Sequence, residues 1–189
     1  MKIIALGGSL RRNSWNQRIA EVAAEGAAQA GASVTIIRLA DYPMPVFNQD
    51  DETANGPNDG VLGLRTMFRE HDGVLLGVPE HNGGPPAALK NAIDWLTRPQ
   101  DGFDRLDCFQ GKVCALVSAS PGHLGGTRGL PITQTILSGI GMYVIPTHHC
   151  VGQVHTCFDA DCTMIDDATR DGLHHVGASL ADTTKRLLG

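Results

Sequence analysis

Three short segments of the sequence carry residue types that bind ligands rather than build a core. The first, residues 7–16, combines two glycines with hydroxyl, amide and guanidinium groups. Unpaired backbone N–H groups at the start of a helix attract anions, and an arginine can bind a phosphate through two hydrogen bonds. We therefore expect a phosphate-binding loop here. Its candidate ligand-binding residues are Ser9, Arg11, Ser14, Trp15 and Asn16.

Ser14 has an alternative role, because Ser14 and Gln17 also match a helix capping box. Capping does not exclude contact with a phosphate. The segment is neither a Walker sequence nor GxGxxG. It also lacks the cysteine that a low-molecular-weight tyrosine phosphatase carries in this place. We therefore expect a site that binds its ligand without a nucleophilic side chain.

The second and third segments suit a flat ligand. Residues 79–86 place two adjacent glycines between prolines, so a planar group can approach the main chain closely while the flanks stay stiff. Residues 118–128 follow an apolar run with small residues that suit a wall beside a ring. A plain surface turn and a mobile glycine-rich turn are the respective alternatives. The candidate residues of both segments are Pro79, Glu80, His81, Asn82, Gly83, Ser118, Ser120 and Gly122.

Histidines and cysteines gather between residues 148 and 162, three of each. Zinc ligands usually occur as tightly spaced pairs. Four residues separate Cys157 from Cys162 and five separate His149 from His155, so both spacings lie at the wide limit for such pairs. A metal site is one hypothesis, and a loop of unligated side chains is the favoured one. The five cysteines, an odd number with no CxxC pair, predict reduced thiols rather than a disulfide framework.

The elements that position these segments alternate between apolar runs and helical periodicity, which predicts an α/β parallel sheet. The expected strands are residues 3–6, 34–39, 73–78, 112–118 and 142–145, the last closed by Pro146. The expected helices are residues 15–30, 61–70, 87–96, one ending near Gly139, and 166–188, with a long loop over 41–60. We expect one domain over residues 1–189, a three-layer flavodoxin-like sandwich of strand order 2-1-3-4-5. Ligands of such sheets bind beyond the carboxyl ends of the strands, where the three segments lie.

Composition narrows the classes of function. The net charge of −5 argues against nucleic acid, which needs a clustered basic face. No apolar run approaches the ~20 residues of a membrane span. Residues 1–6 resemble a first strand rather than a signal peptide. These features predict a cytoplasmic protein that contacts neither membrane nor nucleic acid.

The segments resemble one family, the NAD(P)H-dependent FMN reductases, which include bacterial chromate and quinone reductases. The resemblance covers residues 1 to about 145. It lies in Gly8-Ser9-Leu10-Arg11 with Ser14 and Asn16, Pro79-Glu80-His81-Asn82-Gly83, Leu89-Lys90-Asn91-Ala92-Ile93-Asp94-Trp95-Leu96, Phe109-Gln110-Gly111-Lys112, and Ser118-Ala119-Ser120-Pro121 with Gly125-Gly126.

This resemblance implies a flavodoxin-like fold, tightly held FMN, and a homodimer or homotetramer. By the family pattern, Ser9, Arg11, Ser14 and Asn16 hold the phosphate, residues 79–83 flank the isoalloxazine, and Ser118 and its neighbours line the far side. Hydride would pass from NADPH or NADH to flavin N5, and two electrons then to a small acceptor. That acceptor would be a quinone, a free flavin, or a metal or azo compound. The catalytic contribution of the protein would be mostly positioning.

The sequence departs from the family at three places. The family usually has tyrosine where this chain has His81, and serine is frequent at the position of Gly84. Histidine is smaller than tyrosine and, as a residue type, ionises near neutral pH. One hypothesis is that His81 changes the acceptor preference or the pH dependence of turnover, and an exposed histidine without effect is the alternative. Residues 99–108 also look longer than the usual connection.

Other positions have structural interpretations. Trp95 is expected in the core or at a subunit contact, and the family resemblance favours the subunit contact. Arg65 and Arg69 have the spacing of a solvated helix face. Arg128 is a candidate contact for an NAD(P)H phosphate or an anionic acceptor, with no contact as an equal alternative.

Two other classes of protein compete with the reductase. A flavodoxin-type carrier shuttles single electrons without its own NAD(P)H turnover, and usually has a strongly acidic face and a threonine-rich phosphate loop. The mild net charge and Arg11-Arg12 disfavour it. A flavin-binding sensor or partner domain would bind FMN without turnover.

Overall fold

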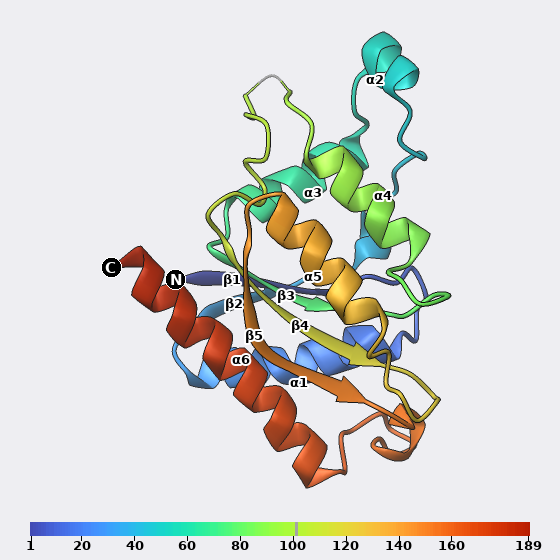
Figure 1. The fold of residues 1–189 in the computed structure, drawn as a ribbon, viewed down its shortest axis with the longest axis vertical. Helices are drawn as coiled ribbons and strands as arrows, with labels where there is room; N and C mark the ends of the chain where they lie inside the picture. Colours follow the sequence, from blue (N-terminus) through green and yellow to red (C-terminus); the bar gives the residue numbers. More distant parts are fainter. Residues whose placement is uncertain (101) are drawn as a thin grey trace.

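A sheet of five parallel strands forms the centre of the molecule, in the order β2-β1-β3-β4-β5 (Figure 1). This order confirms the predicted topology. The structure is a computed structural model that describes residues 1–100 and 102–189. The strands are β1 (Lys2–Gly7), β2 (Ser33–Ile36), β3 (Gly73–Gly77), β4 (Val113–Ala119) and β5 (Tyr143–Val151).

Helices cover both faces of the sheet and complete the three layers. Helices α1 and α6 lie on one face, whereas α3, α4 and α5 lie on the other (Figure 1). The short α2 stands away from the sheet. The helices are α1 (Trp15–Gln29), α2 (Gln49–Asn55), α3 (Asp59–Arg69), α4 (Ala87–Leu96), α5 (Gly129–Gly139) and α6 (Asp167–Leu188), with 3-10 turns η1 (Leu39–Asp41) and η2 (Val154–Thr156).

The central strands are apolar throughout because both of their faces are covered. Successive side chains of a strand point to opposite faces. Ile3 and Ala5 therefore belong to the core beneath α1 and α6, whereas Ile4 and Leu6 belong to the core beneath α3, α4 and α5. This arrangement holds β1, β3 and β4 as a rigid base for the segments at their carboxyl ends.

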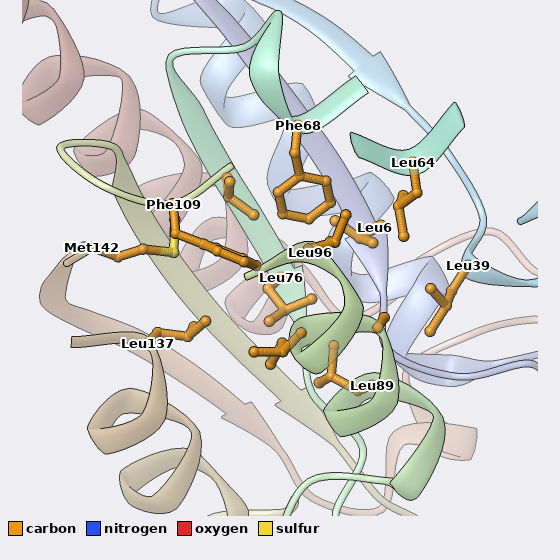
Figure 2. Close-up of a pocket in the computed structure, with 13 residues that line it drawn as sticks. Leu6, Leu39, Leu64, Phe68, Leu76, Leu89, Leu96, Phe109, Leu137 and Met142 are labelled. Carbon is orange, nitrogen blue, oxygen red and sulfur yellow. The ribbon is translucent and has the colours of Figure 1, made fainter. Parts of the chain in front are cut away.

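A small cavity lies inside the second of these cores (Figure 2). Its volume is about 20 Å³, and apolar side chains from the sheet and the helices above it point toward it. A cavity of this size, lined only by apolar groups, offers a water no hydrogen-bond partner and stays dry. It is a packing defect rather than a ligand site. The labelled lining residues in Figure 2 are Leu6, Leu39, Leu64, Phe68, Leu76, Leu89, Leu96, Phe109, Leu137 and Met142.

The prediction for the fifth strand is wrong at its end. Strand β5 does not stop at Pro146 but continues to Val151. The register against β4 shifts here, because Val144 pairs with Cys114 whereas His148 pairs with Leu116. Two extra residues of β5 are accommodated at this irregularity, and proline is tolerated at a bulge of an edge strand. The histidines at 148 and 149 are therefore strand residues, not loop residues.

Two further predictions need correction on the α3 side. The expected loop over 41–60 contains α2, whose N-cap Asn48 accepts a hydrogen bond from Asp50 N. Arg65 is fully buried rather than solvated, and its guanidinium lies over the ring of Phe103 at 5.1 Å. The segment 99–108 thus covers the end of α3. Asp101, within that segment, lies outside the described residues.

Trp95 is 1% exposed and belongs to the interior of this chain. Its Nε1 donates to Pro45 O at 2.8 Å, and its ring meets that of Phe47 edge-on, with 5.1 Å between centroids. Among the helices that the structure describes, none combines the length and apolarity needed to cross a bilayer.

Candidate functional site

The first predicted segment leaves β1 and leads into α1 at the carboxyl edge of the sheet. Gly8 N donates to Gly77 O at 2.8 Å, which ties this segment to the end of β3. A Cβ on Gly8 would come within 2.7 Å of Leu89 Cδ2, so a larger residue here would displace the side chain of Leu89 on α4. Ser9 Oγ accepts from Arg11 N at 3.2 Å, and the Arg11 side chain is exposed.

Helix α1 begins directly after this segment. Ser14 Oγ accepts from Gln17 N at 3.3 Å, so Ser14 caps the helix, as one of its two predicted roles required. The N–H groups of Trp15 and Asn16 have no helical carbonyl to which they can donate. These N–H groups and the positive end of the helix favour an anion at this place.

The side chain of Asn16 is engaged inside the protein. Its Nδ2 donates to Ala119 O, and its Oδ1 accepts from Ala119 N, both at 2.9 Å. This pair joins the start of α1 to the end of β4. Trp15 also points inward, because its ring packs against Phe158 with 5.3 Å between centroids. Neither side chain is free to reach a ligand in this arrangement.

The second segment folds into a tight hairpin after β3. His81 N donates to Gly84 O at 2.9 Å, and Gly84 N donates to His81 O at 3.1 Å. The two residues at its tip, Asn82 and Gly83, have φ values of 54° and 85°. Positive φ at both positions is typical of a type I′ turn, for which Asn-Gly is the preferred sequence. His81 and Asn82 are exposed, whereas Pro79 is buried.

The third segment follows β4 and packs closely against the second. Ser118 is fully buried, and its Oγ donates to Val78 O at 2.7 Å. A Cβ on Gly126 would fall 1.9 Å from that Oγ, so the glycine allows this close approach. Ser120 N donates to Val151 O at 3.1 Å, which anchors the segment to β5. Ser120 Oγ donates to Gly122 O at 3.1 Å, and Gly122 is exposed.

Glu80 connects the second and third segments. Its carboxylate accepts from Arg128 Nε at 2.8 Å and from Arg128 N at 3.1 Å. The hydrogen bond from the Arg128 side chain holds the pKa of Glu80 below its ordinary value, against the opposite effect of desolvation. Arg128, which the sequence offers as a candidate contact for an NAD(P)H phosphate or an anionic acceptor, thus pairs with Glu80.

The structure thus brings all three segments together at one edge of the sheet. The predicted residues that remain at least partly accessible are Ser9, Arg11, Trp15, Glu80, His81, Asn82, Gly83, Ser120 and Gly122. The predicted residues whose side chains are occupied within the protein are Ser14, Trp15, Asn16, Glu80 and Ser118. The exposed Arg11 and the free N–H groups of α1 fit a phosphate, and the glycine-bearing hairpin fits a flat ring beside it.

Sequence reasoning missed a groove next to the first segment. It has a volume of about 630 Å³ and lies between residues 39–47 and α4. Asn91 of α4 fixes the position of the 39–47 segment, because its Oδ1 accepts from Phe47 N at 2.7 Å and its Nδ2 donates to Pro45 O at 2.9 Å. The proline-rich composition after residue 41 marked a functional loop, but nothing in it showed that the loop folds onto α4. The groove is lined by Leu10, Leu39, Ala40, Tyr42, Pro43, Met44, Val46, Phe47, Ala87, Ala88, Lys90, Asn91 and Asp94.

The histidine- and cysteine-rich stretch divides between β5 and the turns that follow. Within the part of the chain that the structure describes, no three histidine, cysteine, aspartate or glutamate side chains converge as metal ligands would. His149 is half-buried, and desolvation, with a smaller effect of His148, lowers its pKa. All five cysteines are free.

Comparison with known proteins gives consistent matches. The family model described as NADPH-dependent FMN reductase matches residues 1–156. A quinone reductase from Pseudomonas putida is 32% identical over 180 residues, covering 95% of this chain and 81% of that protein. An NAD(P)H-dependent FMN reductase from Pseudomonas aeruginosa is 29% identical over 191 residues, covering 100% of this chain and 98% of that protein.

Solved structures agree with these matches. FerB, a flavoenzyme NAD(P)H:(acceptor) oxidoreductase from Paracoccus denitrificans, superposes with a TM-score of 0.79 at 26% identity, covering 98% of this chain and 97% of that one. An archaeal flavodoxin superposes with a TM-score of 0.62 at 14% identity, covering 98% of this chain and 99% of that one. This likeness concerns the fold alone.

Proposed function

Because this chain belongs to the NADPH-dependent FMN reductase family, we propose that its three joined segments form the FMN site of a reductase for small acceptors. The protein is a flavin-dependent NAD(P)H oxidoreductase, with FMN as its cofactor. One observation supports this location of the FMN site. All three segments lie together at the carboxyl edge of the sheet, and Arg11 is exposed beside the start of α1.

The phosphate end of FMN would lie at the first segment. Arg11 would donate to the phosphate from its guanidinium, and Ser9 from its hydroxyl. The N–H groups of Trp15 and Asn16 would add two backbone donors. Ser14 would act mainly through its cap of α1, and its hydroxyl proton remains able to donate.

The ring end would lie beside the hairpin at residues 81–84. Main-chain groups of Asn82 and Gly83 would border the isoalloxazine, with Ser120 and Gly122 toward the opposite side. Bound FMN supplies the two-electron chemistry, accepting and returning a hydride equivalent at N5. The protein supplies position and shelter, and no side chain has to form a covalent bond.

We propose a quinone as the principal class of acceptor, supported by relatives named quinone reductases, with chromate and azo compounds as further substrates to test. We also propose that the 189 residues act as one domain and that the protein is cytoplasmic, consistent with five free cysteines.

A homodimer or homotetramer is proposed as well, with the face around the 39–47 groove as the contact. Leu10 is 57% exposed there and Val46 is 83% exposed.

The test is to purify the full chain, reconstitute it with FMN, and record its visible spectrum anaerobically before and after addition of NADPH or NADH. A reductase bleaches rapidly and is reoxidised by a quinone. A one-electron carrier keeps its oxidised spectrum, and a sensor domain gives no steady-state oxidation of NAD(P)H with any acceptor. A colourless protein that FMN does not reconstitute contradicts the proposal. The ratio of kcat/KM for the two nucleotides decides the preferred donor.

A further inference from the structure

The side chain of Glu80 is largely covered by the protein, whereas its partner is largely exposed. The Glu80 side chain is 9% exposed and that of Arg128 is 66% exposed. The carboxylate accepts from the Arg128 Nε, from its backbone N–H, and from a second guanidinium nitrogen. Three donors of one arginine converge on this carboxylate, so the contact is better defined geometrically than a surface ion pair with a single contact.

Glu80 lies beside two glycines at the start of α5. A Cβ on Gly129, the first residue of α5, would lie 3.5 Å from both Glu80 Cβ and Cγ. A Cβ on Gly126 would lie 3.7 Å from Glu80 Cβ as well as in contact with Ser118. The side chain therefore sits against the start of α5, with glycines on the facing surface.

The hairpin that follows Glu80 has few other contacts. His81 and Asn82 are exposed, and nothing lies within 4 Å of a Cβ built on Gly83 or Gly84. Its own two hydrogen bonds hold its shape but not its position. Its position comes from its ends, which are Glu80 on one side and the stiff Pro85-Pro86 on the other, and from Gly84 O, which lies 3.5 Å from a Cβ built on Gly129.

We propose that Arg128, acting through Glu80, is a positioning residue that fixes the 81–84 hairpin relative to α5. The proposal rests on the proposed function in one respect, because that hairpin borders the flavin ring there. Arg128 would then set the main-chain donors beside the ring without touching the ring itself. Loosening the pair would alter the flavin's environment and leave the phosphate end intact.

The first experiment uses the protein without flavin. Hydrogen exchange is measured at the amides of His81 and Gly84 in the parent, Glu80→Gln, Arg128→Gln and the double variant. We expect roughly tenfold faster exchange in each single variant, and no further increase in the double variant, because one interaction is lost in all three. Arg128→Lys should restore part of the protection. Unchanged exchange, or additive effects, overturns the proposal.

The control is Glu52→Gln, because Glu52 is 10% exposed and accepts from Arg98 Nε at 2.9 Å. It matches Glu80 in burial and in its arginine partner, but it joins α2 to the end of α4. Its loss should lower the melting temperature without changing exchange at the hairpin. Faster exchange of His81 and Gly84 in this control indicates a general loosening and overturns the specific role.

The second experiment uses the FMN-loaded protein. In Glu80→Gln and Arg128→Gln, the affinity for FMN should stay within about threefold of the parent, while the flavin midpoint potential and the KM for a quinone shift. An unchanged potential, spectrum and KM would mean that the pair is only structural. If the parent binds no FMN, the proposed function fails, and exchange at the hairpin still decides whether Arg128 positions it.

Discussion

Arg11 is the exposed side chain whose proposed role is simplest to isolate. It lies in the first segment, beside the free N–H groups of α1. Replacing Arg11 by alanine removes a charge-assisted hydrogen bond to the phosphate, so we expect FMN affinity to fall roughly 10- to 100-fold. Affinity for riboflavin, which has no phosphate, should not change. Titration of flavin fluorescence measures both.

The control for this variant is Arg186→Ala, in the last turn of α6, which makes the same change in net charge. It should bind both flavins like the parent. Equal losses for FMN and riboflavin in Arg11→Ala would place the arginine away from the phosphate, and an unchanged FMN affinity would remove it from the site.

His81 tests whether the departure from the family tyrosine has a consequence. The imidazole lies on the exposed hairpin beside the proposed ring site. Replacement by tyrosine introduces a larger ring and exchanges an imidazole for a phenol, a residue type that ionises only near pH ~10, so we expect altered selectivity between quinones and a different pH profile of kcat/KM. Steady-state kinetics of the two proteins decide this. Superimposable profiles with the same selectivity would leave His81 without a functional role.

Glu80 predicts a pH dependence of stability. Its pKa is lowered in the folded protein, chiefly by the hydrogen bond from Arg128. A carboxyl with a lowered folded pKa contributes stability above its unfolded pKa of about 4.3, and this contribution is lost as pH falls through the folded pKa. The melting temperature of Glu80→Gln should therefore lie below that of the parent at neutral pH, and the gap should close in acid. Asp161→Asn, at an exposed position, is the control, and a gap independent of pH would contradict the prediction.

At the scale of elements, Asn16 joins the start of α1 to the end of β4. Replacement by alanine leaves the N–H and C=O of Ala119 without these partners in a buried place, which should cost about 2–3 kcal/mol. The expected fall in melting temperature is roughly 4–12 °C. Asn13→Ala, an exposed asparagine in the same segment, should change it little. Equal effects of the two substitutions would deny Asn16 this role.

The elements that are predicted correctly from the sequence are those in which every residue has the same kind of surroundings, so that the local pattern alone identifies them. Strands β1, β3 and β4 are apolar because they are covered on both faces, and Ser14 and Gly31 mark the two ends of α1. The carboxyl edges of these strands then brought the three segments together. The structure joins these segments at that edge, as the strand order predicts.

The errors arose where tertiary contacts override the local pattern. Pro146 suggested a strand end, but a bulge of an edge strand accommodates it. Arg65 has the spacing of a solvated face, but Phe103 arrives from a distant segment and covers it. The residue type of Asn16 predicts a donor to a ligand, whereas its side chain binds Ala119, which is 103 residues away. No local signal reports such a partner.

At the scale of the whole molecule, the exposed apolar face beside α4 is the feature that a single chain leaves unexplained. Val46 is 83% exposed and Leu10 is 57% exposed, at the rim of a groove of about 630 Å³. Apolar rims of this kind mark contact surfaces. Covering this face by a second copy would also shelter the first segment of the proposed flavin site from water. Assembly and cofactor binding would then be linked, because each stabilises the same segment.

The prediction is that Val46→Asp shifts the protein to monomers, because a buried unpaired carboxylate at the contact is costly. Light scattering after size exclusion should show the mass of a single chain, or the dissociation constant raised at least roughly tenfold. Leu187→Asp makes the same chemical change at a residue 53% exposed near the end of α6, and should leave the mass unchanged. A parent protein that is monomeric, or a Val46→Asp variant with the parent's mass, would exclude this face as the contact. Weaker FMN binding in the monomeric variant would establish the link between assembly and the cofactor.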